Sequence, residues 1–456
     1  MKNLSIKILN KVINVNNVEN FNQEANQHKG FNTLIVAAPD MIGRLVGRRL
    51  PFREVKEKTK VSVGVCSSIL AWDAEQLPID GLSIAGFHTG WQDMNIVSDL
   101  ALIRPVSWHN QSVIAIGDVY DKAGKIVPVA PRSILQAQIR RLKEVGLIAT
   151  VATELEFYLT PNSNVARRAI RKRHDYAIDG VTNKMEFFFD ELRNNLASSN
   201  IMVESWQSEW GLGQWEVNLA RGNPIDVADS HTLFKLAVKE FAEKHGYKAN
   251  FMAKPESFQV GSSGHIHISL RDKSGRPVLF DHSVPQHISK TCLYAIRGIL
   301  HYTPECMPLY ASNINSYRRL AAGEFCGQGP SWGLDNRTVT CRVIADDEES
   351  AHLEFRIPGA DANPYLAIAG VLASVRKGIL DQREPNKKII GNASVQVSKL
   401  YPMTLELATE NFIKSSWSKD EFGEEFVSHF GAHLKHEFQQ FGSSVTDWEL
   451  KRYADV

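Results

Sequence analysis

The sequence lacks the features that mark membrane, disulfide-bonded and nucleic-acid-binding proteins. No apolar run approaches the ~18–20 residues that a membrane-spanning helix needs, and Lys and Asn interrupt the first residues too often for a signal-peptide core. The five cysteines are odd in number, scattered and without a C-x-x-C spacing, which favours reduced thiols. A formal net charge of +1 gives no general attraction for nucleic acid or anionic membranes. We therefore expect a cytoplasmic protein that binds neither.

The length indicates more than one domain. At 456 residues the chain exceeds the ~250–300 residues at which a single core usually splits, and its 43% hydrophobic and 23% charged residues are ordinary for a globular protein. The Asn-rich residues 1–30 are expected to be a lead-in segment. An amphipathic helix is predicted over 133–146, after a change of character at 128–132. We place the boundary near 125, which gives an N-terminal domain of residues 1–125 and a larger domain of residues 126–456.

The hydrophobic pattern predicts an alternation of strands and helices. Residues 33–37 and 44–50 are expected to form a hairpin, 71–99 to be rich in loops, and 100–104 and 112–118 to be strands. Further helices are predicted at about 184–199, 228–246, 286–303, 364–381, 404–415 and 421–441. The C-terminal aromatic residues Phe430, Phe438, Phe441 and Trp448 are expected to lie in the core.

Two short motifs carry the strongest chemical signal. Glu154 and Glu156 are two residues apart in a predicted strand over 151–159, and His265 and His267 have the same spacing in a predicted strand over 265–270. Side chains alternate across a strand, so each pair projects from one side. Two adjacent like charges destabilise a strand unless a positive charge lies between them. A bound divalent cation is the simplest such charge.

Further clusters combine carboxylates with arginines. The segment 209–216 carries Glu209 and Glu216 on either side of a glycine-containing turn, and the segment 313–319 precedes a glycine-rich stretch, 323–329. Later clusters contain Arg337, Arg342, Glu354 and Arg356. Hard cations such as Mg²⁺ and Mn²⁺ take oxygen ligands, and arginine binds phosphate or carboxylate bidentately. The mixture favours phosphoryl transfer, in which metals and arginines neutralise charge.

Each motif has a less specific interpretation when it is considered alone. A single E-x-E on a strand is a solvated edge in ~70% of cases by our prior, and an isolated H-x-H is more often structural than ligating. The basic run 167–173 is expected to be a solvated loop. The joint occurrence of all the clusters favours a single site, because otherwise each of the less specific interpretations would have to hold independently.

The motif order resembles the glutamine synthetase family from about residue 33 onward. The motifs are E-L-E-F-Y-L, E-x-x-x-G-Q-x-E, G-H-I-H-I-S, N-x-N-S-Y-R-R-L, W-G-x-D-N-R-T and E-F-R-I-P-G-A-D-A-N-P-Y-L. The last two are similar to the γ-glutamylputrescine and other γ-glutamylamine synthetases. The resemblance implies an α+β fold, with a small N-terminal β-grasp domain and a catalytic domain built on a curved antiparallel β-sheet with flanking helices. It also implies stacked rings, commonly a dodecamer, with each site completed by the neighbouring N-terminal domain.

The resemblance assigns roles by motif position. It implies two to three Mg²⁺ or Mn²⁺ ions, with one site formed by Glu156, Glu209 and Glu216 and the other by Glu154, His265 and Glu354. Glutamate is expected at Gly261 and Arg319, and the phosphoryl group of ATP and its acceptor carboxylate at Arg337, Arg342 and Arg356. His267 and Ser269 fall on the ATP side.

The flexible flap departs from the glutamine synthetase pattern. Counting without gaps from Arg319 to Asn336, Phe325 occupies the position of a glutamate that binds ammonium, and Glu324 lies one residue early. The assisting aspartate is expected to be Asp73, and the neighbouring aromatic residues Trp72, Phe87 and Trp91 suggest an acceptor with carbon bulk. This predicts an ATP-dependent ligase that joins the γ-carboxylate of L-glutamate to an organic amine through γ-glutamyl phosphate.

Alternatives remain open at this stage. The acceptor could be a diamine, an alkylamine or an aromatic amine, and Asp73, His88 or Glu324 could deprotonate it. True glutamine synthetase activity with ammonia is the second hypothesis, with Glu324 serving the flap. A non-catalytic family member is the third, and it is disfavoured because all six ligand positions hold competent residues.

Overall fold

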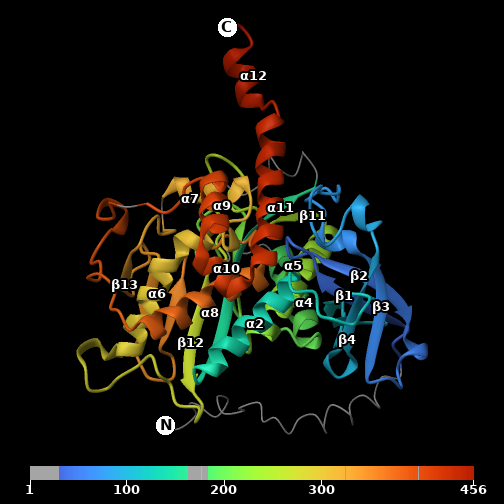
Figure 1. Ribbon diagram of the computed structural model, residues 1–456, viewed down its shortest axis with the longest axis horizontal. Coiled ribbons are helices and arrows are strands. Elements are labelled where there is room, and N and C mark those ends of the chain that lie inside the picture. Colours follow the sequence, from blue (N-terminus) through green and yellow to red (C-terminus); the bar gives the residue numbers. More distant parts are fainter. Residues whose placement is uncertain (1–29, 163–175, 177–182, 324, 399) are drawn as a thin grey trace.

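The N-terminal part of the chain forms two small sheets. The computed structural model describes residues 30–162, 176, 183–323, 325–398 and 400–456. The first sheet has the order β2-β1-β6-β5 and the second the order β3-β4-β7. β1 to β4 of these sheets lie together at the right of Figure 1. Their bounds are β1 Thr33–Pro39, β2 Leu45–Pro51, β3 Lys60–Cys66, β4 Asp93–Asp99, β5 Arg104–Pro105, β6 Ser112–Ile116 and β7 Asp118–Tyr120.

An eight-stranded sheet forms the centre of the larger part. Its order is β13-β14-β15-β12-β8-β10-β9, with β11 also paired to β8. All pairings are antiparallel except that of β13 with β14, so the predicted sheet is confirmed with one parallel edge. The strands are β8 Leu147–Pro161, β9 Val203–Ser208, β10 Gln214–Leu219, β11 Tyr247–Asn250, β12 Ile266–Asp272, β13 Trp332–Leu334, β14 Cys341–Ile344 and β15 His352–Phe355.

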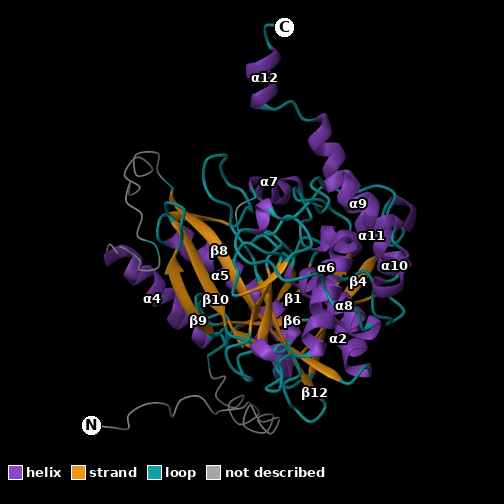
Figure 2. Cartoon of the chain, turned by 90° about the vertical axis from the view of Figure 1, so that its left-hand side faces the viewer, coloured by secondary structure: helices purple, strands orange, loops and turns teal. Residues whose placement is uncertain are grey.

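Helices cover one face of this sheet (Figure 2). Buried residues of β8 such as Leu155 and Phe157 pack with Phe188 of α4 and Phe234 of α5. Glu154 and Glu156 alternate with these residues and therefore face the other side. The helices are α2 Pro131–Glu144, α4 Asn183–Ser198, α5 Pro224–Lys244, α6 Lys290–Cys306, α7 Ile314–Ala322, α8 Pro364–Asp381, α9 Leu405–Lys414, α10 Ser416–Phe422, α11 Glu424–Ser443 and α12 Asp447–Tyr453.

The sequence predicted the hairpin but missed two strands. β1 and β2 pair antiparallel, and the turn between them contains Gly43 at φ 84°. The strand predicted over 100–104 is wrong, because the Asp99 carboxylate caps a 3-10 turn over Leu100–Leu102 and only Arg104–Pro105 pairs with β6. β4 lies within the stretch expected to be loops, and β3 was not predicted although its valines alternate with exposed residues. The lead-in segment and the basic run 167–173 lie outside the described residues.

The end of α11 and the whole of α12 extend away from the body (Figure 1). Phe430 is buried and Phe438 packs against the core, but Phe441 is 38% and Trp448 59% exposed. The expectation that all four aromatic residues are core is therefore wrong for Phe441 and Trp448, because Phe441 lies near the end of α11 and Trp448 on α12, beyond the part of α11 that is buried. Among the described residues, no helix is long and apolar enough to cross a membrane.

Two buried histidines of α11 bind the N-terminal part of the chain. His429 Nε2 and His433 Nε2 lie 2.7 and 3.0 Å from the carbonyl oxygen of Leu70. Burial lowers the pKa of His429 to about 4, and burial with the neighbouring His429 lowers the pKa of His433 to about 3. Both imidazoles are therefore neutral and donate to one carbonyl at neutral pH.

We predict that this contact makes the protein acid-sensitive. The unfolded state protonates near the ordinary histidine pKa of 6.5, whereas in the folded state His429 resists protonation until about pH 4 and His433 until about pH 3. Stability should therefore fall as pH drops below about 6.5, down to about pH 4 for His429 and about pH 3 for His433, by up to about 1.4 kcal/mol per pH unit for each histidine. Urea unfolding of His433→Gln should show a shallower pH slope. The exposed variant His282→Gln is the control, and an unchanged slope in His433→Gln would contradict the assignment.

Candidate active site

The strand register brings the predicted site residues into a stripe across five adjacent strands. Glu216 of β10 lies opposite Glu156 of β8, and Asn218 lies opposite Glu154. On the other side of β8, His267 of β12 is opposite Glu354 of β15, which is opposite Arg342 of β14. We call the carboxylates Glu154, Glu156, Glu216 and Glu354 the carboxylate stripe.

One half of the carboxylate stripe is balanced by cationic and imidazole groups. His265 Nδ1 lies 2.7 Å from Glu154 Oε1 and 3.3 Å from Glu354 Oε1, and His267 Nε2 lies 3.4 Å from Glu154 Oε2. Burial opposes ionisation of Glu354, but Arg356 and His265 outweigh it and lower its pKa to about 2. The same histidines hold the pKa of Glu154 well below its usual range against the effect of burial. These two carboxylates are ionised at neutral pH.

The other half lacks such balance. Burial, then the charges of Glu209 and Glu154, raise the pKa of Glu156 to about 8. Burial, then Glu154 and Glu156, raise the pKa of Glu216 to about 9. Their nearest donors are neutral, with Ser263 N 2.6 Å from Glu156 Oε2 and Asn218 Nδ2 2.8 Å from Glu216 Oε1. A cation at this position would remove the repulsion that holds protons on these groups.

The donor set fits hard divalent cations. Ligand atoms of Glu154, Glu156 and Glu216 lie within 4.8 Å of one another, and so do those of Glu154, His267 and Glu354. Mostly carboxylate oxygens with one imidazole suit Mg²⁺ or Mn²⁺. The buried Nε2 of His265 has no hydrogen-bond partner among the described residues, which also marks an unsatisfied group beside the stripe. Bound there, such ions would supply neutralisation of phosphate charge.

Arginines border the stripe on the β14 side. Arg342 Nη1 lies 2.7 Å from Glu354 Oε2 and its Nη2 lies 2.6 Å from Asp335 Oδ1, while Arg356 Nη1 pairs with Glu354. Arg356 Nε is buried and has no partner among the described residues. Arg337 is largely exposed, with Asp335 Oδ1 4.0 Å away. Ser269 lies two residues beyond His267 on β12 and so on the same side of the sheet.

Gly261 and Arg319 pack directly against each other. A Cβ on Gly261 would lie 2.7 Å from the Cγ of Arg319 and 2.7 Å from the carbonyl oxygen of Ala253, so only glycine fits. Arg319 is buried and donates to the carbonyl oxygens of Ile357 and Arg356 and to Ser263 Oγ. Arg319 therefore links α7 to the segments that contain Ser263 and Arg356.

Phe325 of the flap segment 323–329 contacts an arginine of the site. Phe325 adopts a left-handed φ of 55° and is 59% exposed, and its carbonyl oxygen accepts a 3.0 Å bond from Arg356 Nη2. Gly323 and Gly327 are also left-handed, with φ of 77° and 64°, a conformation that glycine adopts at little cost. Glu324 lies outside the described residues.

The predicted N-terminal acceptor residues lie apart from the stripe. Asp73 Oδ1 accepts from the backbone of Glu75 and Leu77, and Asp73 Oδ2 lies 3.2 Å from His436 Nε2. Trp72 Nε1 donates to Asp40 Oδ2 at 3.2 Å. Phe87 is exposed and packs edge-on against Trp91, while His88 Nε2 lies 3.3 Å from Ser83 O. Among the described residues, no hydrogen bond or ion pair joins Asp73 to the stripe within one chain.

Two features of the site were missed in the sequence. Gln214 is buried and its Nε2 donates to Glu156 Oε2 at 3.2 Å and to Gly261 O at 3.0 Å, and its place between the two glutamates of its motif could have revealed it. Tyr176 and Trp210 form an exposed aromatic pair with ring centroids 5.7 Å apart, and Trp210 N donates to Glu209 Oε2 at 2.8 Å. No spacing in the sequence would have paired these two rings.

We predict that Glu156→Gln and Glu216→Gln lose turnover by roughly a hundredfold or more at saturating Mg²⁺. Without cation, both variants should unfold at the same or a higher temperature than the wild type, because each removes a mutually repelling carboxylate. The control is Glu204→Gln, an exposed carboxylate on the neighbouring strand β9. Steady-state assays and thermal unfolding with and without Mg²⁺ measure this, and near-wild-type turnover in either stripe variant would refute the cation site.

Known proteins are similar to this chain in both sequence and fold. A glutamate–isopropylamine ligase from a Pseudomonas species is 33% identical over 439 residues, covering 93% of this chain and 95% of that protein. A γ-glutamylethanolamide synthetase from Streptomyces coelicolor is 34% identical over 431 residues, covering 92% of each. Ligand-free GmaS superposes with a TM-score of 0.82 at 23% identity, covering 94% of this chain and 98% of that one.

The family model for the glutamine synthetase catalytic domain matches residues 128–453. This range contains the whole carboxylate stripe, its bordering arginines and the flap. The match covers well over half of the chain, and the predicted resemblance is confirmed: the chain belongs to the glutamine synthetase family.

Proposed function

We propose that this protein is an ATP-dependent ligase that joins the γ-carboxylate of L-glutamate to an organic amine. The observation that carries this is the carboxylate stripe beside Arg342 and Arg356, with an exposed phenyl ring of Phe325 on the flap. The names of two similar proteins, an isopropylamine ligase and an ethanolamide synthetase, support an amine acceptor.

The chemistry requires activation of a poor acylating agent. The γ-carboxylate of glutamate attacks the γ-phosphoryl group of ATP, which forms γ-glutamyl phosphate and releases ADP. An uncharged amine then attacks the acyl carbon, and phosphate leaves as the amide forms. Arg342 and Arg356 would neutralise phosphate charge, and two to three divalent ions held by the stripe and Glu209 would share this role. His267, Ser269 and Arg337 are proposed to contact ATP, and Gly261 and Arg319 to shape the glutamate site.

Aromatic side chains favour an amine with carbon bulk. Phe325, Trp210 and Tyr176 are 59%, 64% and 54% exposed. Aromatic rings bind alkyl and aromatic groups, and they also attract organic ammonium ions through their faces. The amine must lose its proton before attack, and an apolar surrounding lowers the pKa of a bound ammonium. We propose that Asp73, His88 or Glu324 is the base that accepts this proton.

We further infer a ring assembly, for which a dodecamer is the family expectation. The apolar side chains of α12 would be covered by another copy, since Trp448, Leu450 and Tyr453 are each more than half exposed. Asp73 Oδ1 accepts from the backbone of its own loop and Asp73 Oδ2 lies 3.2 Å from His436 Nε2 of α11, and the neighbouring subunit would bring that loop to the stripe. The five free cysteines fit a reducing cytoplasm.

Acceptor choice should depend on Phe325. We predict that the wild type prefers an organic amine to ammonia in kcat/KM, and that Phe325→Glu shifts the ratio toward ammonia by about ten- to a hundredfold, the value of ~1.5–3 kcal/mol of apolar contact. Phe187→Glu changes an exposed phenylalanine on α4 and is the matched control. Phosphate release is measured with ATP, glutamate and a panel of diamines, alkylamines and anilines. A wild-type preference for ammonia over every amine would replace this proposal with glutamine synthetase activity.

Assembly should depend on the exposed face of α12. Trp448→Glu should dissociate the ring into smaller species with lower activity, because it removes an apolar contact worth about 1.5–3 kcal/mol at each copy. Lys451→Glu on the same helix serves as the charge control. Light scattering coupled to size exclusion gives the mass, and an active wild-type species near the 51.1 kDa of a single chain would contradict the ring.

A further inference from the structure

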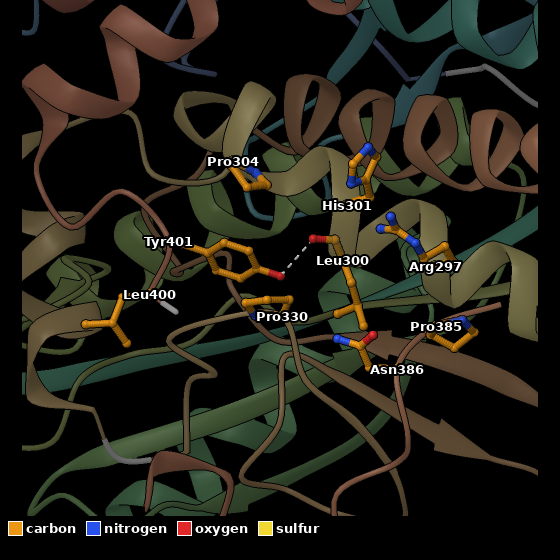
Figure 3. A pocket seen from close by; sticks show the side chains of 9 residues that line it. All are labelled: Arg297, Leu300, His301, Pro304, Pro330, Pro385, Asn386, Leu400 and Tyr401. Atoms are coloured by element: carbon orange, nitrogen blue, oxygen red, sulfur yellow. Dashed lines mark hydrogen bonds between the residues drawn. The ribbon is translucent and has the colours of Figure 1, made fainter. Parts of the chain in front are cut away.

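A pocket of about 170 Å³ lies between α6 and the segments around residues 330, 385 and 400. Its lining residues are Arg297, Leu300, His301, Pro304, Pro330, Pro385, Asn386, Leu400 and Tyr401. In Figure 3, Arg297 and His301 lie together at one side of the pocket and Tyr401 and Pro330 at the other. None of these residues belongs to the carboxylate stripe or to its bordering arginines.

The pocket is lined by a cationic side chain, that of Arg297. Arg297 and His301 are four residues apart on α6 and therefore share one face of the helix. Among the described residues, neither side chain makes a hydrogen bond or an ion pair. Nearby carboxylates are already engaged: Asp381 accepts from Tyr302 Oη at 2.6 Å and pairs with Lys377, and Glu305 accepts from Ser415 Oγ. Burial and the nearby Arg297 lower the pKa of His301, so Arg297 carries the charge.

The rest of the lining is apolar. Leu300, Pro304 and Pro330 present aliphatic surface, and the ring of Tyr401 is buried with its hydroxyl donating to Leu300 O at 3.3 Å. Asn386 adds an amide donor to the lining. A ligand that satisfies both parts has one anionic group and a compact apolar body.

The pocket is joined to the flap by hydrogen bonds. Pro330 follows the flap segment directly, and Tyr401 N donates to Gln328 O at 2.8 Å. Gln328 Nε2 donates in turn to Leu320 O at 3.0 Å near the end of α7, and Thr340 Oγ1 donates to Gly329 O at 2.6 Å. A molecule wedged against Pro330 and Tyr401 would therefore restrain the part of the flap that follows Phe325.

We propose that this pocket binds a small organic carboxylate as an effector and that the bound ligand slows turnover by restraining the flap. Opening of a loop over the site limits product release in many enzymes, so a restraint on this segment is expected to lower kcat. The pocket itself is independent of the proposed acceptor, and only the effect on turnover rests on the proposed function.

Benzoate is the probe. Inorganic phosphate is the second ligand tested, because it is anionic but has no apolar body. Calorimetric titration of the intact assembly without ATP or glutamate should show saturable benzoate binding, weaker binding of phosphate, and at least a tenfold loss in Arg297→Gln. Lys290→Gln, an exposed residue at the start of α6, is the matched control and should bind as the wild type does. Absence of saturable binding, equal binding by Arg297→Gln, or tighter binding of phosphate than of benzoate would overturn the site.

The effector role is tested by turnover. Saturating benzoate should lower the kcat of the wild type and of Lys290→Gln at least twofold and leave Arg297→Gln unaffected. Binding that leaves the wild-type kcat unchanged would overturn the effector role. Since the titration needs no turnover, a failure of the proposed ligase reaction is distinguished from a failure of the pocket.

Discussion

Mutual repulsion within the carboxylate stripe is the constraint around which the catalytic part is built. At an effective dielectric constant of about 20, two like charges 4 Å apart repel by about 4 kcal/mol. The antiparallel register makes this repulsion unavoidable, because Glu216 lies opposite Glu156. The protein compensates for it on the β12–β15 side, where histidines and arginines lower the pKa of Glu354 to about 2. On the β10 side the pKa of Glu216 rises to about 9.

This imbalance gives the two halves of the stripe different properties. The Glu154–Glu354 half is ionised and held in place before any ion arrives, because His265 and Arg356 bind its oxygens. The Glu156–Glu216 half would release protons when a cation binds, so its affinity should depend more strongly on pH. Neutral donors such as Gln214 and Asn218 still orient these oxygens. The geometry of the site is thus set before a cation binds. A bound cation would supply the positive charge that the Glu156–Glu216 half lacks.

The N-terminal part is fixed to the catalytic part by buried polar contacts. Arg132 pairs with Asp118 of β7 and with Asp229 of α5, which also accepts from Tyr365 Oη at 2.7 Å. Around the loop of Asp73, Arg44 donates to the carbonyl oxygens of Ala74 and Asp73. A loop fastened in this way is held in a defined conformation.

The flap shows how local conformation and the site are linked. Phe325 adopts a left-handed conformation, which costs a non-glycine residue about 1–2 kcal/mol. Its carbonyl bond to Arg356 offsets part of that cost, and the same arginine binds Glu354. Arg356 therefore contacts both the carboxylate stripe, through Glu354, and the flap, through Phe325.

The sequence by itself determined which residues are candidates for the chemistry and on which side of their strands they lie. The spacing of Glu154 and Glu156 put both carboxylates on one side of β8, because side chains alternate along any strand. The motif order predicted the family, since several specific patterns in one order rarely arise together. The hairpin of β1 and β2 was also predictable from its local turn.

Only the tertiary structure decided how these residues meet. That Glu216 faces Glu156 depends on the pairing of β10 with β8, and that His265 touches both Glu154 and Glu354 depends on β12 lying between β8 and β15. The exposure of Trp448 was misjudged because an apolar residue at helical spacing looks the same in a core helix and in one that leaves the body. Pairing between distant segments sets register, burial and pKa, and local sequence does not encode which distant segment will be the neighbour.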